Sequence, residues 1–408
     1  MEGYLELKKK LRQQIVDQLS FLQEQSDNVV KELIDETICK NEGLLLVPLE
    51  VRKRLREELY NSIRGLDILQ VLVDDNSITE IMINGSDSIF IEREGRLLKL
   101  DMAFESKEKL IDIIQQIVAG CNRTVNEASP IVDARLSGGA RVNIVMNPVA
   151  IDGPVVTIRR FPDKQITMQE LIQRESISEE LAEFLERLVK GKYNIFISGG
   201  TGAGKTTFLN VLSGFIPEDE RIVTIEDSAE LQLQGLHNLV RLETRNGNVE
   251  GCREIRIRDL IRTSLRMRPD RIIVGEVRGE EAADMITCMN CGMEGSMCTG
   301  HANSATDMLD RLENMILMAK EVPVSSIRRQ VASGLDILIH LGRLRDKSRK
   351  VLEVLEVLRS GDNQVELRPL YRFRETGEEK GRIRGKYIKE GELTHVEKLQ
   401  RAGISLPK

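Results

Sequence analysis

The first 64 residues show a pattern of apolar positions that is typical of helices. Leu7, Leu11, Ile15, Leu19 and Leu22 recur at spacings of three and four, and Leu55, Leu59 and Ile63 repeat the spacing after Pro48. The polar positions between them are highly charged. We therefore predict a helical N-terminal segment over residues 1–64, serving as a small bundle or a docking appendage.

Residues 65–163 show a different pattern, in which short runs of alternating residues surround one amphipathic stretch. The stretch Ser106–Ala119 predicts a helix with Leu110, Ile113, Ile114 and Ile117 on one side. Turns are predicted at Glu94-Gly95 and across residues 137–140. The predicted strands are Thr79–Asn84, Ser88–Glu92, Arg96–Leu100, Ile131–Leu136, Arg141–Met146 and Val155–Ile158. This pattern indicates an α+β domain, followed by a linker over residues 164–178.

From residue 179 onward, short apolar strands alternate with helical or looped segments. The predicted strands are Asn194–Ser198, Ile222–Glu226, Leu239–Glu243, Ile272–Gly275, Met297–Thr299, 337–341 and 351–358. Such alternation favours an α/β fold with a mainly parallel sheet. The tail from Arg368 is polar and basic with weak periodicity, and we treat it as a C-terminal extension of the domain that ends at residue 408.

Composition narrows the class of protein further. The chain has 408 residues, a formal net charge of −6, 3% aromatic residues and no Trp. Single-stranded nucleic acids are commonly bound by stacking on aromatic rings, so we expect no nucleic-acid partner. No apolar run reaches the ~18 residues of a membrane span, and the N-terminus lacks a signal-peptide pattern. We expect a cytoplasmic chain whose six cysteines are reduced.

The strongest chemical signal is the run Gly199-Gly200-Thr201-Gly202-Ala203-Gly204-Lys205-Thr206, which is followed by Thr207. It matches the phosphate-binding loop of P-loop proteins, follows an apolar strand and opens a helix. Backbone N–H groups of such a loop surround phosphate oxygens, and the helix N-terminus favours anions. Lys205 would bind the β- and γ-phosphates and Thr206 would ligate Mg²⁺. We predict that ATP and Mg²⁺ bind here.

Two further strands end in carboxylates, and a third ends in a histidine. The run Thr224–Glu230 places Glu226 and Asp227 at one strand end, and Gly275-Glu276 closes another. Open α/β sheets bind ligands at the carboxyl ends of their strands. Gly275 stands where many P-loop enzymes have a Mg²⁺-binding Asp, whereas Glu276 could orient or deprotonate the attacking water. His301 ends the next strand.

Four segments resemble, in their order along the chain, the motifs of type II/type IV secretion ATPases. The Walker A loop is matched by GGTGAGKTT, the Asp box by TIEDSAEL, the Walker B strand by IIVGEVRGEEA and the His box by TGHANS. The upstream segments VDARLSGGARVNIV and GPVVTIRRF are similar to the CpaF-type ATPases of tight-adherence (Flp) pili. The resemblance spans residues 65–345. It implies a RecA-like motor domain, a homo-hexameric ring, and ATP hydrolysis that works a polytopic inner-membrane platform protein from the cytoplasmic face.

The resemblance also implies roles for single residues. Glu276 is expected to be the catalytic base, Glu226 and Glu230 belong to the Asp box, and His301 senses the phosphate. The phosphate-loop residues expected to bind nucleotide are Gly200, Thr201, Gly202, Ala203, Gly204, Lys205, Thr206 and Thr207. The N-terminal-domain arginines expected to reach towards phosphates are Arg135, Arg141, Arg159 and Arg160, because guanidinium groups pair with phosphate in bidentate fashion.

Several alternatives remain open at the level of sequence. Cys288, Cys291 and Cys298 with His301 could suggest zinc, although inert thiols are the default interpretation. Eight Arg in residues 253–278 and eight Lys or Arg in residues 368–389 could serve intersubunit, partner or lipid contacts, or lie on solvated faces. A nucleic-acid translocating motor and a non-hydrolysing nucleotide sensor are the competing functions. Pilus assembly and protein secretion, and extension and retraction, are not distinguished.

Overall fold

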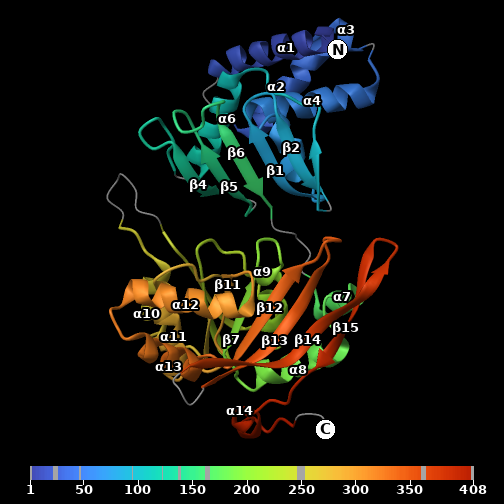
Figure 1. Cartoon of the computed structure of the whole chain (residues 1–408). Coiled ribbons are helices and arrows are strands. Elements are labelled where there is room, and N and C mark those ends of the chain that lie inside the picture. Colours follow the sequence, from blue (N-terminus) through green and yellow to red (C-terminus); the bar gives the residue numbers. More distant parts are fainter. Residues whose placement is uncertain are drawn as a thin grey trace. The chain divides into compact units, whose positions relative to one another are not determined.

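The computed structural model describes residues 2–21, 26–45, 47–93, 95–121, 123–136, 139–160, 166–245, 253–359 and 364–405. Predicted features at Leu22, Glu94 and Ser137-Gly138 and the start of the linker lie outside these residues. The chain divides into two compact units, Met1–Lys164 and Gln165–Lys408 (Figure 1).

The first unit begins with the predicted helices. They are α1 (Glu2–Ser20), α2 (Asp27–Lys40), α3 (Glu42–Leu45) and α4 (Leu49–Ile63). Leu11, Ile15 and Leu55 are among the residues that form their common core. The apolar stripes read from the sequence therefore face one another, which buries them without any sheet.

A six-stranded antiparallel sheet follows in the same unit, with strand order β3-β2-β1-β6-β5-β4 (Figure 1). Its elements are α5 (Ile68–Asp74), β1 (Ile78–Asn84), β2 (Ile89–Arg93), β3 (Arg96–Lys99), α6 (Lys107–Gly120), β4 (Ile131–Arg135), β5 (Arg141–Val145) and β6 (Val155–Arg159). The buried side of α6 packs into a core with inward residues of the strands, such as Ile81 and Ile158. The opposite residues of β4, β5 and β6 form a mixed face of charged, polar and apolar side chains.

The second unit is built on a nine-stranded sheet of order β15-β14-β13-β12-β7-β11-β10-β8-β9 (Figure 1). The strands from β12 to β9 in this order pair in parallel, whereas β12 to β15 pair antiparallel. The parallel strands are β7 (Ile195–Gly199), β8 (Arg221–Glu226), β9 (Asn238–Glu243), β10 (Arg271–Val274), β11 (Met297–His301) and β12 (Ile337–Arg343). The mixed α/β architecture predicted from the strand–helix alternation is confirmed.

Helices cover both faces of this sheet. On one face α8 and α9 share a core with β7, and on the other α10 to α13 share a second core with the same strands. The helices are α7 (Met168–Gln173), α8 (Glu179–Lys190), α9 (Lys205–Ser213), α10 (Ile257–Ser264), α11 (Glu281–Asn290), α12 (Ala305–Ala319), α13 (Val324–Gly334) and α14 (Glu397–Arg401). Helix α7 falls within the predicted linker, where a capping box of Thr167 and Glu170 starts it.

The basic tail, whose weak periodicity indicated no particular element, does form regular structure. It forms most of a hairpin of β14 (Val365–Glu379) and β15 (Arg382–Lys389), which pairs onto β13 (Arg349–Arg359). Few of its side chains are buried, among them Leu370, Tyr371 and Ile383. Where a strand is exposed, as β14 is from Arg374 onward, it lacks the alternation of apolar and polar residues that identifies strands in a sequence.

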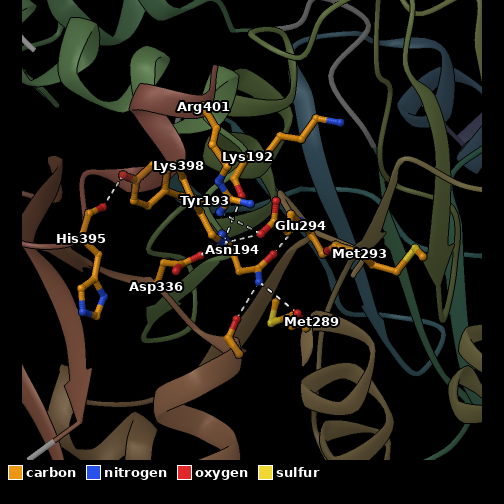
Figure 2. A network of polar contacts seen from close by, with 12 residues as sticks. Lys192, Tyr193, Asn194, Met289, Met293, Glu294, Asp336, His395, Lys398 and Arg401 are labelled. Atoms are coloured by element: carbon orange, nitrogen blue, oxygen red, sulfur yellow. Dashed lines mark hydrogen bonds and ion pairs between the residues drawn. The ribbon is translucent and has the colours of Figure 1, made fainter. Parts of the chain in front are cut away.

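The last helix is anchored at the amino ends of the parallel strands, as Figure 2 shows around Asn194 and Asp336. The buried Asn194 amide donates to Gly334 O at 2.6 Å and accepts from the Ser296 N–H at 3.0 Å. Asp336 accepts from the Asn194 N–H at 2.7 Å and from Lys398 of α14 at 2.6 Å. These contacts tie α14 to the edge of the sheet opposite the carboxyl ends.

Candidate nucleotide site

The phosphate loop lies between the end of β7 at Gly199 and the start of α9 at Lys205. Gly202 and Gly204 have φ angles of 72° and 93°, in the left-handed region where residues with a Cβ are strained. The loop sequence therefore fits its conformation. Ala203 is buried, Gly200, Gly204, Thr206 and Thr207 are half-buried, and Thr201 and Gly202 are exposed.

Lys205 is buried, and its ammonium group lies between the loop and β11. Nζ donates to Gly199 O at 3.0 Å and to Gly200 O at 3.1 Å, and it lies 3.2 Å from Nδ1 of His301. Because an ammonium group can only donate, Nδ1 must accept. His301 Nε2 lies 2.9 Å from Oε1 of Glu276, a carboxylate that can only accept. A neutral His301 protonated on Nε2 is compatible with both distances, and the ring lies between Lys205 and Glu276; Oε1 of Glu276 nevertheless has no hydrogen-bond partner of good geometry among the described residues.

Burial and charged neighbours together determine the protonation states of His301 and Glu276. Burial lowers the pKa of His301, and the positive charge of Lys205 lowers it further, which keeps the ring neutral near pH 7. Burial raises the pKa of Glu276, but the hydrogen bond from Arg278 Nη2 at 2.8 Å and nearby positive charges outweigh it. The pKa of Glu276 therefore lies below its usual value, and the group is a carboxylate. This role of Arg278 was not predicted from the sequence, where its signal is its position two residues after Glu276.

Glu226 provides a second, different carboxylate at the end of β8. Its Oε2 accepts from the N–H groups of Glu230 and Leu231 at 2.7 and 2.8 Å. Oε1 is buried and has no hydrogen-bond partner among the described residues. Burial raises the pKa of Glu226 to about 7 in spite of the two backbone donors. A buried carboxylate oxygen without a donor is costly, so Oε1 needs water or a ligand as a partner.

These side chains meet because parallel strands end at one edge of a sheet. The strand order β7-β11-β10-β8 puts His301 beside the phosphate loop, then Glu276, then Glu226. The residues at this carboxyl edge of the sheet are of the kinds that bind ATP with Mg²⁺. The glycine loop and Lys205 provide donors for phosphate, and Thr206 provides one oxygen ligand at the start of α9. Mg²⁺ takes its remaining ligands from phosphates and water, so one protein ligand is sufficient.

Three of the four predicted N-terminal arginines lie in one row across the antiparallel sheet of the first unit. Arg135 is paired with Arg141, and Arg141 with Arg159, while Glu80 and Glu92 continue the row on β1 and β2. Directly paired residues share a face, and adjacent like charges repel. An anion held against the three guanidinium groups would offset this repulsion.

Arg160 is not part of this row. It follows β6 on the alternate side of the strand, and its guanidinium group donates to Asp75 O and, at 2.6 Å, to Asn76 Oδ1. These partners lie in the turn between α5 and β1. The structure therefore gives Arg160 a role in holding that turn, and separates it from Arg135, Arg141 and Arg159.

The cysteines near His301 have the surroundings of buried thiols. Cys288 and Cys298 are buried, burial raises the pKa of Cys288 to about 12, and His301 contacts Lys205 and Glu276. Across the described ranges, no three or more His, Cys, Asp or Glu side chains are grouped to hold a metal ion.

Many of the clustered arginines have acidic partners in their own unit. In residues 253–278, Arg258 pairs with Glu280 and Asp284, and the fully buried Arg271 pairs with Glu220. In the β14–β15 hairpin, Arg372 contacts Glu353 and Glu390. Further pairs of this kind join Arg256–Glu280, Arg262–Asp284, Arg374–Glu390 and Arg384–Glu379. These pairings account for much of the clustered charge without a partner.

No helix in the part of the chain that the structure describes combines the length and apolar character of a membrane span.

The chain is similar in sequence to proteins of conjugal transfer and type IV secretion. The chain is 31% identical over 316 residues to the conjugal transfer protein TrbB of Rhizobium radiobacter, covering 76% of this chain and 93% of TrbB. It is 29% identical over 329 residues to the type IV secretion system protein VirB11 of Bartonella quintana, covering 71% and 91%.

Solved structures show the same fold. The pilus retraction motor PilT with bound ADP matches with a TM-score of 0.52 and 18% identity, over 72% of this chain and 84% of PilT. The DotB ATPase of Legionella pneumophila matches with a TM-score of 0.51 and 20% identity, over 72% and 80%. The family model for type II/IV secretion system proteins matches residues 63–390. The chain belongs to the type II/IV secretion system protein family.

Proposed function

We propose that this chain hydrolyses ATP and that its turnover drives a pilus or secretion apparatus. The observation that carries the proposal is the contact series from Lys205 through His301 to Glu276, which joins the phosphate loop to the ends of β11 and β10. A group that binds phosphate and a candidate base are thereby connected through one neutral ring. A protein that only senses nucleotide would need no such carboxylate beside its phosphate loop.

In this account each side chain has a distinct task. The loop N–H groups and Lys205 bind the phosphates, and Thr206 holds Mg²⁺, which neutralises phosphate charge when bound. Glu276, held as a carboxylate, accepts a proton from the attacking water or orients it. His301, which lies between Glu276 and Lys205, keeps these two side chains in place relative to each other. Glu226 offers its unpaired oxygen as a further acceptor and is the second candidate for the base.

The same proposal gives Arg135, Arg141 and Arg159 to the γ-phosphate. Stabilising charge that develops in the transition state raises turnover, whereas equal binding of the ground state does not. Hydrolysis would weaken the grip of these arginines and so change the arrangement of the two units, as domain closure does in other motors.

More specifically, we propose that the chain forms a homo-hexameric motor that is most similar to the CpaF-type ATPases of tight-adherence pili. It would work from the cytoplasm on a polytopic platform protein of the inner membrane. The resemblance of VDARLSGGARVNIV and GPVVTIRRF supports this assignment, and the names of the relatives place such proteins in secretion and conjugal transfer. Light scattering with and without a non-hydrolysable ATP analogue tests the ring. A monomer at every concentration and nucleotide state would contradict it.

Steady-state ATP turnover of the wild type beside Lys205→Ala tests the enzyme function itself. We expect turnover by the wild type and loss of both nucleotide binding and turnover in the variant, because the phosphates lose their buried cation. Binding without turnover in the wild type would instead indicate a nucleotide sensor. Stimulation by DNA that falls steeply with salt would indicate a nucleic-acid motor.

A further inference from the structure

Gly275 and Glu226 are in close contact at the ends of two neighbouring strands. The N–H of Gly275 donates to Ile225 O at 2.9 Å, which continues the pairing of β10 with β8. A Cβ added to Gly275 would lie 3.0 Å from Cγ of Glu226 and 3.6 Å from its Cβ. The space that a side chain at position 275 would need is therefore occupied by Glu226.

Neither residue can move away cheaply. Two N–H groups hold Oε2 of Glu226, from Glu230 at 2.7 Å and from Leu231 at 2.8 Å. The carbonyl oxygen of Gly275 accepts from Thr299 Oγ1 at 2.7 Å. Gly275 does not have a positive φ angle, so its backbone conformation is open to other residues. The contact with Glu226 is thus the reason that position 275 needs glycine.

We propose that Gly275 is a positioning residue for Glu226: the absence of its side chain creates the space that fixes Glu226 in the site. The proposal rests on the proposed ATPase function. Many P-loop enzymes have a Mg²⁺-binding Asp at this position of the strand, whereas here a carboxylate reaches the same place from the neighbouring strand β8. Oε2 serves as the anchor, and the unpaired Oε1 is left to accept from a reacting group such as the attacking water.

A double-mutant cycle tests this role. In the wild-type background, Gly275→Ala should lower kcat at least ~5-fold, because displacements of a fraction of an ångström misplace a reacting group. Nucleotide binding, followed by fluorescent-nucleotide titration, should change less than ~2-fold, since the phosphate loop is untouched. In the Glu226→Ala background the same change should alter kcat less than ~2-fold, because the added methyl group no longer meets Cγ.

Thermal unfolding provides a readout that does not depend on activity. Gly275→Ala should lower the unfolding midpoint when Glu226 is present, and Glu226→Ala/Gly275→Ala should recover much of that loss. Gly120→Ala is the matched control, because a Cβ at Gly120 would meet nothing within 4 Å. Equal losses of kcat and midpoint in both backgrounds would overturn the role of Gly275.

Failure of the positioning role of Gly275 can be distinguished from failure of the proposed ATPase function. An active wild type with unchanged Gly275→Ala turnover would overturn only the positioning role. A wild-type chain that turns over no ATP would overturn the proposed function, and this role with it.

Discussion

His301 Nε2 lies 2.9 Å from Oε1 of Glu276, while Nδ1 of the same ring lies 3.2 Å from Nζ of Lys205. The neutral tautomer with its proton on Nε2 is the one compatible with both distances, and Oε1 of Glu276 has no hydrogen-bond partner among the described residues. It reaches this place because His301 pairs in register with Gly199, the last residue of the strand before the phosphate loop. The candidate base and the phosphate-binding lysine therefore both lie within 3.2 Å of a single side chain.

We predict that His301→Ala lowers turnover at least ~10-fold, because Glu276 loses the group that orients it. Nucleotide binding should persist, since Lys205 keeps its contacts with Gly199 O and Gly200 O. Steady-state kinetics beside a nucleotide titration measure both. His237→Ala is the control, because His237 is exposed and precedes the amino end of β9, whereas the site lies at the carboxyl ends of the strands. Equal kinetics for the two variants would remove His301 from the site.

The pH dependence of kcat/KM should identify the base. The pKa of Glu276 is held below its usual value, and that of His301 is lowered, so neither loses its active form as pH falls to about 6.5. Glu226, whose pKa is raised to about 7, would lose its carboxylate form over that range. Because Glu226 is only a secondary acceptor in this account, we expect a fall of less than ~2-fold from about pH 8 to about pH 6.5. A fall below about pH 7 in proportion to the lost carboxylate form of Glu226, abolished by Glu226→Gln, would make Glu226 the base.

Adjacent arginines should behave differently. Arg159→Ala should lower turnover at least ~10-fold, about 1.4 kcal/mol of barrier, with nucleotide binding retained. Arg160→Ala should leave turnover nearly unchanged and reduce the free energy of unfolding by ~1 kcal/mol, since it loses its hydrogen bonds to Asp75 and Asn76. Each variant is the control for the other. The reverse pattern in kinetics and thermal unfolding would exchange the two roles.

The sequence predicted which residues lie at the site better than it predicted the contacts between their side chains. Lys205, Glu226, Glu276 and His301 each follow an apolar strand, and parallel strands end at one edge, so their approach could be expected. The role of Arg278 and the close packing of Gly275 on Glu226 depend on side-chain placement across strands, which no local pattern specifies.

Other elements escaped prediction for different reasons. Strand β14 is exposed from Arg374 onward and β15 is mostly exposed, so these stretches lack the alternation that identifies a strand. Arg159 and Arg160 are adjacent in a sequence pattern, yet strand geometry sends them to opposite sides. The anchor of α14 joins Asn194 to residues more than 100 positions later, such as Asp336 and Ser296.

That anchor gives a prediction about stability. Asn194→Ala should lower the free energy of unfolding by ~2–3 kcal/mol, because it leaves Gly334 O and the Ser296 N–H buried without their partners. Chemical denaturation of the full chain measures this loss. Gln232→Ala, a substitution of an exposed amide, is a matched control that should change stability little. Equal stability of the two variants would mean that water replaces the Asn194 amide.

Steady-state ATP hydrolysis by purified wild type and Glu276→Gln, each with a fluorescent-nucleotide titration, tests the central claim most directly. The substitution keeps the shape of the side chain and removes only its ability to accept a proton as a carboxylate. We predict that the variant binds nucleotide like the wild type and hydrolyses it at least ~100-fold more slowly. Turnover by Glu276→Gln at the wild-type rate would contradict the assignment of Glu276 as the base.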